Sequence, residues 1–174
     1  MNELRVVGVR VEMPANQPIV LLKEAEGTRY LPIWIGAVEA SAIAFQQQGV
    51  TSARPLTHDL LKDVIGALGV ELESIRITEL RDGVFFAELV FPGGVTVSAR
   101  PSDAIALALR VGATIYGAEA VLSEAGVDMP DSQEEAAPDD ADAADLDPVE
   151  QESQVEQFRE FLDSISPDDF AADS

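Results

Sequence analysis

The chain contains no cysteine, which excludes disulfide bonds, thiolate nucleophiles and zinc sites built on cysteine. Histidine is almost as scarce, because His58 is the only one among 174 residues. No apolar run approaches the roughly 20 residues that a membrane-spanning helix needs. The start, MNELRVVGV, has no basic region followed by a long apolar stretch, so it does not resemble a signal peptide. The sequence therefore predicts a soluble cytoplasmic protein that does not contact a membrane.

Basic residues are also few, with 11 Lys and Arg against 32 Asp and Glu, for a net charge of −21. Residues 1–123 hold 14 acidic and 10 basic side chains, whereas residues 124–174 hold 18 acidic ones and a single cation, Arg159. The extreme acidity thus belongs to the tail. Nucleic-acid binders usually carry a basic patch, so the composition alone does not favour such a partner.

Apolar residues make up 47% of the chain and follow two periods. Period-two patterns and turn residues predict strands over residues 4–13, 18–25, 28–35, 71–80, 84–91, 95–99 and 114–117. Helical patterns predict helices over residues 37–48, 57–68, 102–111 and 118–125. These elements indicate one α+β domain over about residues 1–127, with helices packed on a mixed or antiparallel sheet.

The tail divides into two parts. Residues 128–152 are acidic, contain proline and are nearly free of large apolar groups, which predicts a disordered linker. Residues 153–174 begin with a helical stripe of apolar side chains: Val155, Phe158, Phe161, Leu162 and Ile165. Such a short amphipathic helix is stable only if a neighbouring subunit or another protein receives its apolar face.

The tetrapeptide Ser-Ala-Arg-Pro occurs twice, at residues 52–55 and 98–101, each time before a predicted helix. Thr57 and Ser102 are good N-cap residues, and the prolines fix the entry into each helix. Capping does not explain Arg54 and Arg100. Two roles are open for them: an anion site at the two helix starts, or ion pairs with carboxylates such as Asp59 and Asp103.

His58 lies beside Asp59 at the start of a helix, where it is a candidate general acid or base or simply a hydrogen-bonding group. Glu39 interrupts a helical segment of otherwise small and apolar residues. Its carboxylate either stabilises the helix start through the helix dipole or faces a site. Glu39, Asp59 and Asp103 together have the chemistry of a hard divalent-cation site for Mg²⁺ or Mn²⁺, although no ligand-spacing motif is present.

Four segments, LPIWIGAVEASAIA, RPLTHDLL, FFAELVF and ARPSDAIALALR, occur here in that order. Together they resemble the bifunctional nuclease domain family, formerly a domain of unknown function, over about residues 4–125. The ending QFREFLDSISPDDF is similar to the tails of actinobacterial members. The resemblance implies an oligomeric α+β domain that acts on DNA and RNA. The positions that match the family motif are Glu39, Arg54, Thr57, His58, Asp59, Arg100, Ser102 and Asp103. One departure is Ser98, where many members have aspartate before the second Ala-Arg-Pro.

Two classes of function follow. In the first, a nuclease holds a phosphodiester with Arg54, Arg100, Thr57 and Ser102, while His58, Asp59, Glu39 and Asp103 supply the catalysis. In the second, the chain is a non-enzymatic, homo-oligomeric module that binds an anion or a protein, and the acidic tail regulates it.

Overall fold

The structure is a computed structural model, and it describes residues 1–128. The elements in chain order are β1 (Asn2–Glu12), β2 (Gln17–Glu24), β3 (Arg29–Trp34), α1 (Ala37–Gln47), α2 (Thr57–Ala67), β4 (Ser74–Arg81), β5 (Val84–Phe91), the 3₁₀ turn η1 (Pro92–Gly94), β6 (Val95–Ala99), α3 (Pro101–Val111), β7 (Thr114–Gly117), α4 (Glu119–Ala125) and β8 (Val127–Asp128). The remainder of the predicted linker, residues 129–152, and the predicted terminal helix, residues 153–174, lie outside the described residues.

All eight strands form one sheet in the order β6-β5-β4-β7-β1-β2-β3-β8. Two antiparallel sets, β1-β2-β3 and β4-β5-β6, meet through β7, which is antiparallel to β1 and parallel to β4. The mixed sheet with packed helices confirms the predicted α+β class.

The turn between β4 and β5 follows from two residues. Asp82 and Gly83 have φ values of 52° and 77°, and this left-handed pair matches the twist of the two strands that it joins. Asp and Gly adopt such angles more readily than other residues. The predicted strands over residues 71–80 and 84–91 thus form a hairpin, and those over residues 18–25 and 28–35 form another around Glu26-Gly27.

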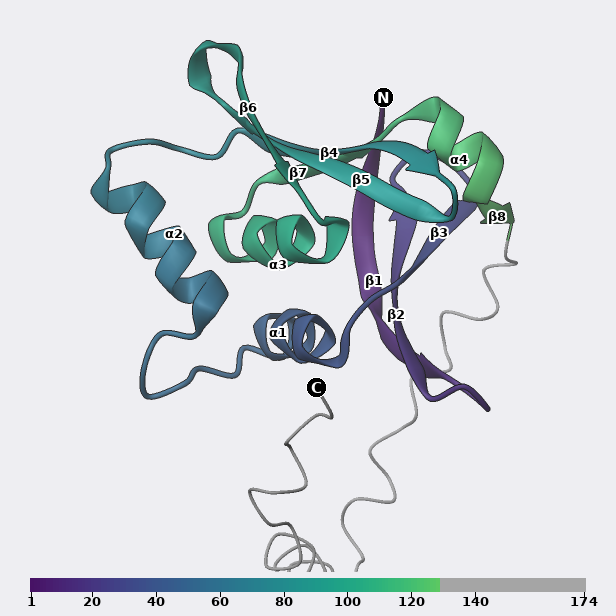
Figure 1. Cartoon of the computed structure of the whole chain (residues 1–174), viewed down its shortest axis with the longest axis horizontal. Helices are drawn as coiled ribbons and strands as arrows, with labels where there is room; N and C mark the ends of the chain where they lie inside the picture. The colour runs from purple at the N-terminus through teal and green to yellow at the C-terminus, as the bar shows by residue number, and fades with distance from the viewer. Residues whose placement is uncertain (129–174) are drawn as a thin grey trace, which may run out of the picture. The chain divides into compact units, whose positions relative to one another are not determined.

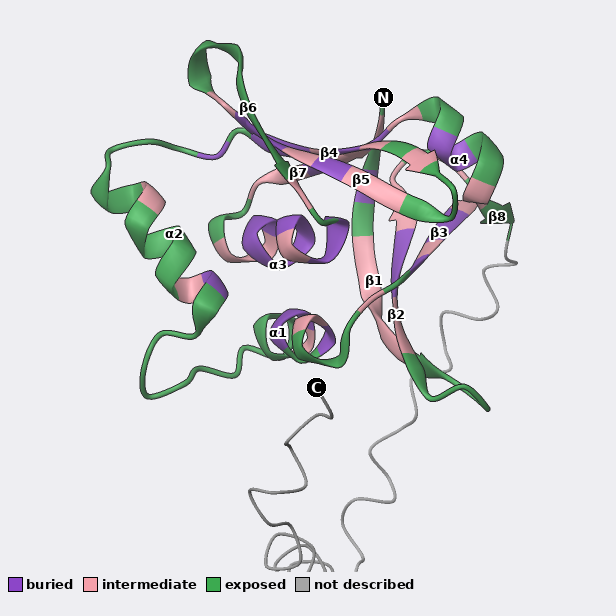
Figure 2. Cartoon of the chain, in the orientation of Figure 1, coloured by how far each residue is buried: buried purple, intermediate pink, exposed green. Residues whose placement is uncertain are grey.

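The core lies between the sheet and two stacked helices. Figure 1 shows α1 and α3 one beside the other under the sheet, and α3 packs on β4, β5 and β7. Ala104 to Ala108 of α3 are all buried, which gives this helix the most buried surface in Figure 2. α4 covers β3 and β4 near the β8 end through Val121 and Leu122.

α2 is packed in an unusual way. It makes its main contacts with α3 rather than with the sheet, and in Figure 2 it is coloured as exposed over most of its length. Its apolar residues are largely exposed, since Leu60, Val64 and Leu68 are 57%, 46% and 73% exposed. Its one buried residue is His58. The helix thus turns its histidine inward and most of its leucines outward.

Within residues 1–128, no helix has the length and hydropathy needed to cross a bilayer.

Candidate functional site

Three candidate carboxylates share one local position. Glu39, Asp59 and Asp103 are each the third residue of their helix, since α1, α2 and α3 begin at residues 37, 57 and 101. An acidic side chain in the first turn interacts favourably with the positive end of the helix dipole. This electrostatic preference is enough to explain why each helix has an acid there, so any site has to be argued from their partners.

The helix starts differ from the capping prediction. α2 has Leu56 at its N-cap and α3 has Arg100, so Thr57 and Ser102 lie inside their helices and neither caps. Pro101 is the first residue of α3, because proline has the φ of a helix and no N–H to leave unsatisfied. In α2 the Asp59 carboxylate accepts the Leu56 N–H at 2.9 Å. The two Ser-Ala-Arg-Pro runs therefore enter their helices in different registers.

Four of the predicted site residues form one continuous chain of contacts. His58 Nε2 lies 3.1 Å from Asp103 Oδ1, and Arg100 Nε donates to Asp103 Oδ2 at 2.8 Å. Arg100 Nη2 also donates to Glu39 Oε1 at 2.6 Å. The starts of α1, α2 and α3 are thus joined by one histidine, two carboxylates and one guanidinium.

The electrostatics of this chain of contacts favour the charged form of Asp103. Burial alone would raise the pKa of Asp103, but the hydrogen bonds from Arg100 and His58 outweigh it and leave the pKa below its usual value. The Arg100 side chain stays 66% exposed, and its Nη1 makes no hydrogen bond with the described residues. The Glu39 side chain is only 14% exposed.

His58 has one nitrogen committed and one free. Its side chain is 10% exposed. Its Nδ1 makes no hydrogen bond within residues 1–128, yet no unpartnered side-chain nitrogen or oxygen is fully buried there. Nδ1 therefore reaches solvent. An imidazole held by a carboxylate on one nitrogen and open on the other has the arrangement of a general base.

Asp59 belongs to a separate contact. Its Oδ1 accepts Arg110 Nε at 2.6 Å, and this bond is the main reason that the pKa of Asp59 is lowered. Arg110 Nη1 also donates to the carbonyls of Ala42 and Ala106, at 3.1 and 2.8 Å. The Arg110 side chain is 4% exposed, so it ties α1, α2 and α3 together from inside. The sequence prediction missed this residue, although a lone arginine in the apolar run AIALALRV signals a buried cation that needs a partner.

Arg54 is not placed with Arg100. It is exposed in the loop before α2 and makes no hydrogen bond or ion pair with the part of the chain that the structure describes. Thr57 is exposed, Ser102 is buried, and Ser98 is exposed on β6 opposite Glu88. The contacts thus unite Glu39, His58, Arg100 and Asp103, and leave Arg54 outside this group.

A hollow of about 370 Å³ lies where α1 and α3 begin. Its wall is formed by the end of β3, the β4–β5 turn and the first residues of both helices: Gln17, Ile33, Trp34, Ile35, Gly36, Gly83, Val84, Phe85, Arg100, Pro101 and Ser102. A side chain at Gly36 would collide with the Glu39 carboxylate, so glycine leaves room for the Glu39–Arg100 pair. The hollow combines one exposed cation with an aromatic wall.

The three candidate cation ligands are separate in the part of the chain that the structure describes. Among residues 1–128, no three His, Cys, Asp or Glu side chains are grouped so that they could hold a metal. Glu39 and Asp103 both direct oxygens at Arg100, and Asp59 directs one at Arg110. Each carboxylate already has a cationic partner.

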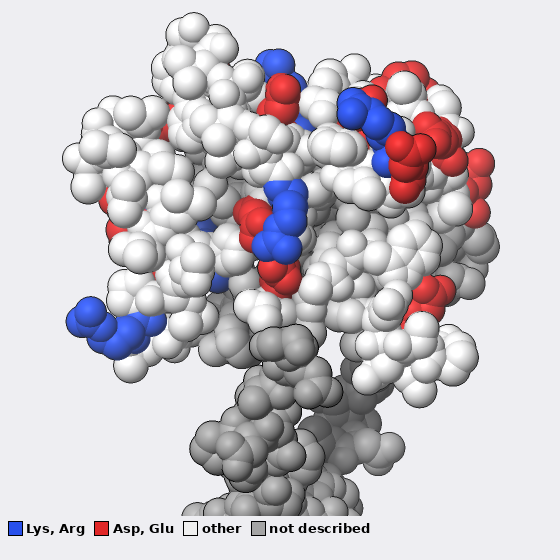
Figure 3. All heavy atoms as spheres, in the orientation of Figure 1, with Lys and Arg blue, Asp and Glu red and all other residues white. Residues whose placement is uncertain are grey.

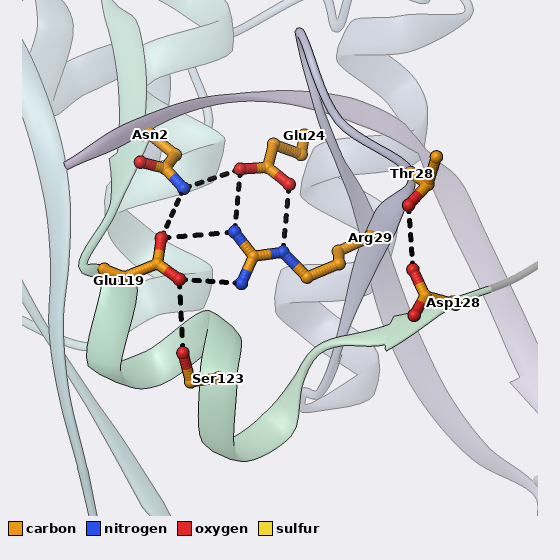
Figure 4. A network of polar contacts seen from close by, with 7 residues as sticks. All are labelled: Asn2, Glu24, Thr28, Arg29, Glu119, Ser123 and Asp128. Carbon is orange, nitrogen blue, oxygen red and sulfur yellow. Dashed lines mark hydrogen bonds and ion pairs between the residues drawn. The ribbon is translucent and has the colours of Figure 1, made fainter.

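A second polar network lies away from these residues and is structural. Figure 4 shows Arg29 between Glu24 and Glu119, with Asn2 donating to both carboxylates. The hydrogen bond from Arg29 is the main cause of the lowered pKa of Glu24 and of Glu119, the latter at about 2. All of these polar groups are satisfied by one another. The network therefore locks the N-terminus and the β2–β3 hairpin to α4.

The surface shows no broad basic patch on the face in Figure 3, where most basic side chains lie against acidic ones. The Arg100 pairs are an instance of this pattern. A phosphate at this site would therefore meet single guanidinium groups rather than a large positive field.

Comparison with known proteins shows which family the chain belongs to. An uncharacterized protein of Mycobacterium tuberculosis is 56% identical over 172 residues, which are 99% of each chain. Bifunctional nuclease 1 of Arabidopsis thaliana is 30% identical over 103 residues, 55% of this chain and 32% of the plant protein. Bifunctional nuclease 2 of Oryza sativa is 28% identical over 110 residues, 59% of this chain and 34% of the plant protein. The chain therefore matches only about a third of the length of these plant relatives. The model of the bifunctional nuclease domain matches residues 20–130, and the chain belongs to that family.

Proposed function

We propose that the chain hydrolyses phosphodiester bonds in nucleic acid, with His58 as the general base. The observation that carries the proposal is the chain of contacts from His58 through Asp103 to Arg100. Of these three residues, Arg100 lines the hollow. The names of the plant relatives support the same class of reaction.

The reaction is assigned as follows. His58 Nδ1 takes a proton from the water whose oxygen attacks phosphorus, and Asp103 stabilises the imidazolium through Nε2. The phosphorus–oxygen bond to the leaving group, on the far side of phosphorus, then breaks. The leaving oxygen takes a proton from solvent, and the imidazolium releases its own proton to solvent. Arg100 Nη1 faces the phosphate charge. Glu39 positions Arg100 from α1.

Replacing the base tests this assignment. His58→Gln in the full chain keeps a polar side chain but cannot accept the proton, so we expect cleavage of single- and double-stranded substrates to fall at least about a hundredfold. Arg5→Gln removes an exposed cation remote from the site and should leave the rate unchanged.

Each assay is run both in EDTA and with added Mg²⁺ or Mn²⁺. These conditions separate the metal dependence of cleavage from its dependence on His58 as the general base. Cleavage that survives both His58→Gln and Asp103→Asn, with or without metal, would point to a contaminating nuclease and reject the proposed function.

A second candidate function is favoured by the outward apolar face of α2, defined here as Leu60, Leu61, Val64 and Leu68. Exposed apolar stripes of this kind mark sites of protein association. In this alternative the chain is a homo-oligomeric binding module in which α2 meets a second copy. The two functions are compatible, since His58 is the buried residue of α2 and the apolar face is exposed.

A further inference from the structure

The hollow at the starts of α1 and α3 has an aromatic wall that the proposed reaction does not use. Trp34 ends β3 with 56% of its surface exposed, while Ile33 before it is buried. The alternation of a strand sends neighbouring side chains to opposite faces, so the Trp34 ring is presented outward by the sheet itself. Phe85, on β5, lies in the same wall and is half-buried.

The Trp34 ring is held in place. Its Nε1 donates to Glu12 Oε2 on β1 at 3.2 Å. This bond uses the only polar atom of the indole and leaves its ring surface as the part available to a ligand. An exposed, oriented tryptophan is costly to leave in water and is the side chain best suited to stack on a flat, electron-poor ring.

The polar groups of the hollow are few and placed at its other side. Arg100 supplies the free Nη1, and the Gln17 amide makes no hydrogen bond within the described residues. Glu12 repels an anion on the Trp34 side of the hollow. A ligand that fits is therefore flat and uncharged at Trp34. Its anionic group can contact only the free Nη1 of Arg100, because Glu39 and Asp103 occupy the other two nitrogens.

The size of the hollow narrows the ligand further. A volume of about 370 Å³ is near the lower end for small-molecule sites and suits a single nucleotide rather than a base pair. A base inside a duplex presents its edges and not its ring surface, so it could not stack on Trp34 without leaving the helix.

We infer that the hollow binds one unpaired nucleotide, with the base stacked on Trp34 and the phosphate at Arg100, and that single-stranded nucleic acid is the preferred substrate class. The inference rests on the proposed function for the role of Arg100. It adds Trp34 as a base-binding residue. It also adds a preference for single-stranded over duplex nucleic acid, which does not follow from the residues assigned to the reaction.

Trp34 is the only tryptophan in the chain, so its fluorescence reports on the hollow directly. The full chain is titrated with four ligands: adenosine monophosphate, an eight-nucleotide single strand, a blunt duplex of equal length and inorganic phosphate. EDTA is present throughout, so that binding is measured separately from metal-assisted cleavage. We expect saturable quenching by the nucleotide and the single strand, at least tenfold weaker binding of the duplex, and no response to phosphate alone.

Variants are compared by the fluorescence anisotropy of a labelled single strand. Trp34→Ala should weaken binding about tenfold to a hundredfold, and Trp34→Phe should weaken it less, because stacking is retained in part. Phe45→Ala is the matched control, since Phe45 is an exposed aromatic residue that does not line the hollow. Trp34 is exposed at the end of a strand, and thermal melting checks that each variant is folded.

The outcomes separate the two proposals. Equal binding of duplex and single strand, equal quenching by phosphate, or an unchanged affinity of Trp34→Ala would overturn the inference, even if the chain cleaves nucleic acid. Conversely, Trp34-dependent binding in a chain whose cleavage survives His58→Gln would support the hollow and reject the proposed base.

Discussion

At the scale of single residues, arginines determine what the carboxylates at the helix starts can do. Arg100 holds Glu39 across 61 residues of sequence, and Arg110 holds Asp59 across 51. The two arginines differ in burial, with side chains 66% and 4% exposed. We therefore propose that Arg100 binds a ligand and that Arg110 stabilises the fold.

Loss of Arg110 should destabilise the domain strongly. Arg110→Met removes the donor to Asp59 and to two backbone carbonyls inside the helix layer. We expect the free energy of unfolding to fall by about 3 kcal/mol, measured by urea denaturation. The double variant Asp59→Asn with Arg110→Met no longer leaves a carboxylate without its cation and should recover part of the loss. A single variant as stable as the parent chain would show that the pair contributes little.

The Arg29 network should give a distinct dependence of stability on pH. The folded pKa of Glu119 is depressed to about 2 from its ordinary 4.5, so the network is fully stabilising above that ordinary value. Its contribution is lost as the pH falls from about 4.5 toward 2, because the unfolded chain then binds the proton first. The melting temperatures of the parent chain and Glu119→Gln should differ by a constant amount above pH 5 and converge below pH 3. A difference that grows on acidification would contradict this assignment.

At the scale of elements, α2 carries two surfaces with different tasks. Its inner side places His58 and Asp59 against α3, and its outer side presents the apolar face. The inner contacts are these two polar pairs and the packing of Ile65 against the core, so α2 depends on them for its position.

A charge on the outer face of α2 tests self-association. Val64 is 46% exposed, so Val64→Glu should change the free energy of unfolding of a monomer by no more than about 0.5 kcal/mol. If a second copy covers this face, sedimentation equilibrium will show a shift toward monomer. Lys62→Glu, on the same helix but outside the apolar face, is the control for added negative charge. A parent chain that is monomeric at all concentrations would reject the oligomer.

The elements themselves were largely predictable, because their signals are local. The turn between β4 and β5 requires left-handed backbone angles, which Asp82 and Gly83 adopt more readily than most residues. Gly49, which follows α1, likewise has a φ of +68°. The N-caps were misplaced by one residue in α2, where Leu56 takes the position expected for Thr57, and by two in α3. In α3, proline at the first helical position moves the boundary ahead of Ser102. Local patterns thus predict the type of an element better than its ends.

The site was predictable only in part, because its contacts are long-range. The residue types at Glu39, His58, Arg100 and Asp103 indicated chemistry, but no spacing says that His58 meets Asp103 across 45 residues and not the adjacent Asp59. Amphipathicity likewise predicts an apolar face on α2 without saying whether the domain covers it. Trp34 gave no sequence signal beyond being the only tryptophan.

At the scale of the whole molecule, charge is the property that most affects a nucleic-acid partner. The chain carries −21 in total, and 18 of its 32 acidic residues lie at or beyond residue 124. A tethered polyanion lowers the local concentration of another polyanion, and salt screens this effect over about 10 Å at 0.1 M.

Removing the acidic segment should therefore raise the affinity for nucleic acid. We expect deletion of residues 129–174 to strengthen binding of a single strand several-fold at low salt, and the gain to vanish as salt increases. A chain of full length with Asn and Gln in place of the acidic residues 131–152 separates charge from length. Unchanged binding in both variants would exclude a regulatory effect of the tail.

The docking of α2 has one more consequence. The helix that holds the imidazole against Asp103 is also the helix that carries the exposed apolar face. Any molecule that binds the outer side and shifts α2 changes the distance from His58 to Asp103, and by thermodynamic linkage a ligand that favours one position of His58 changes the affinity for that molecule equally. If the proposed assembly and the proposed chemistry both hold, they share a single conformational equilibrium, which is the position of α2.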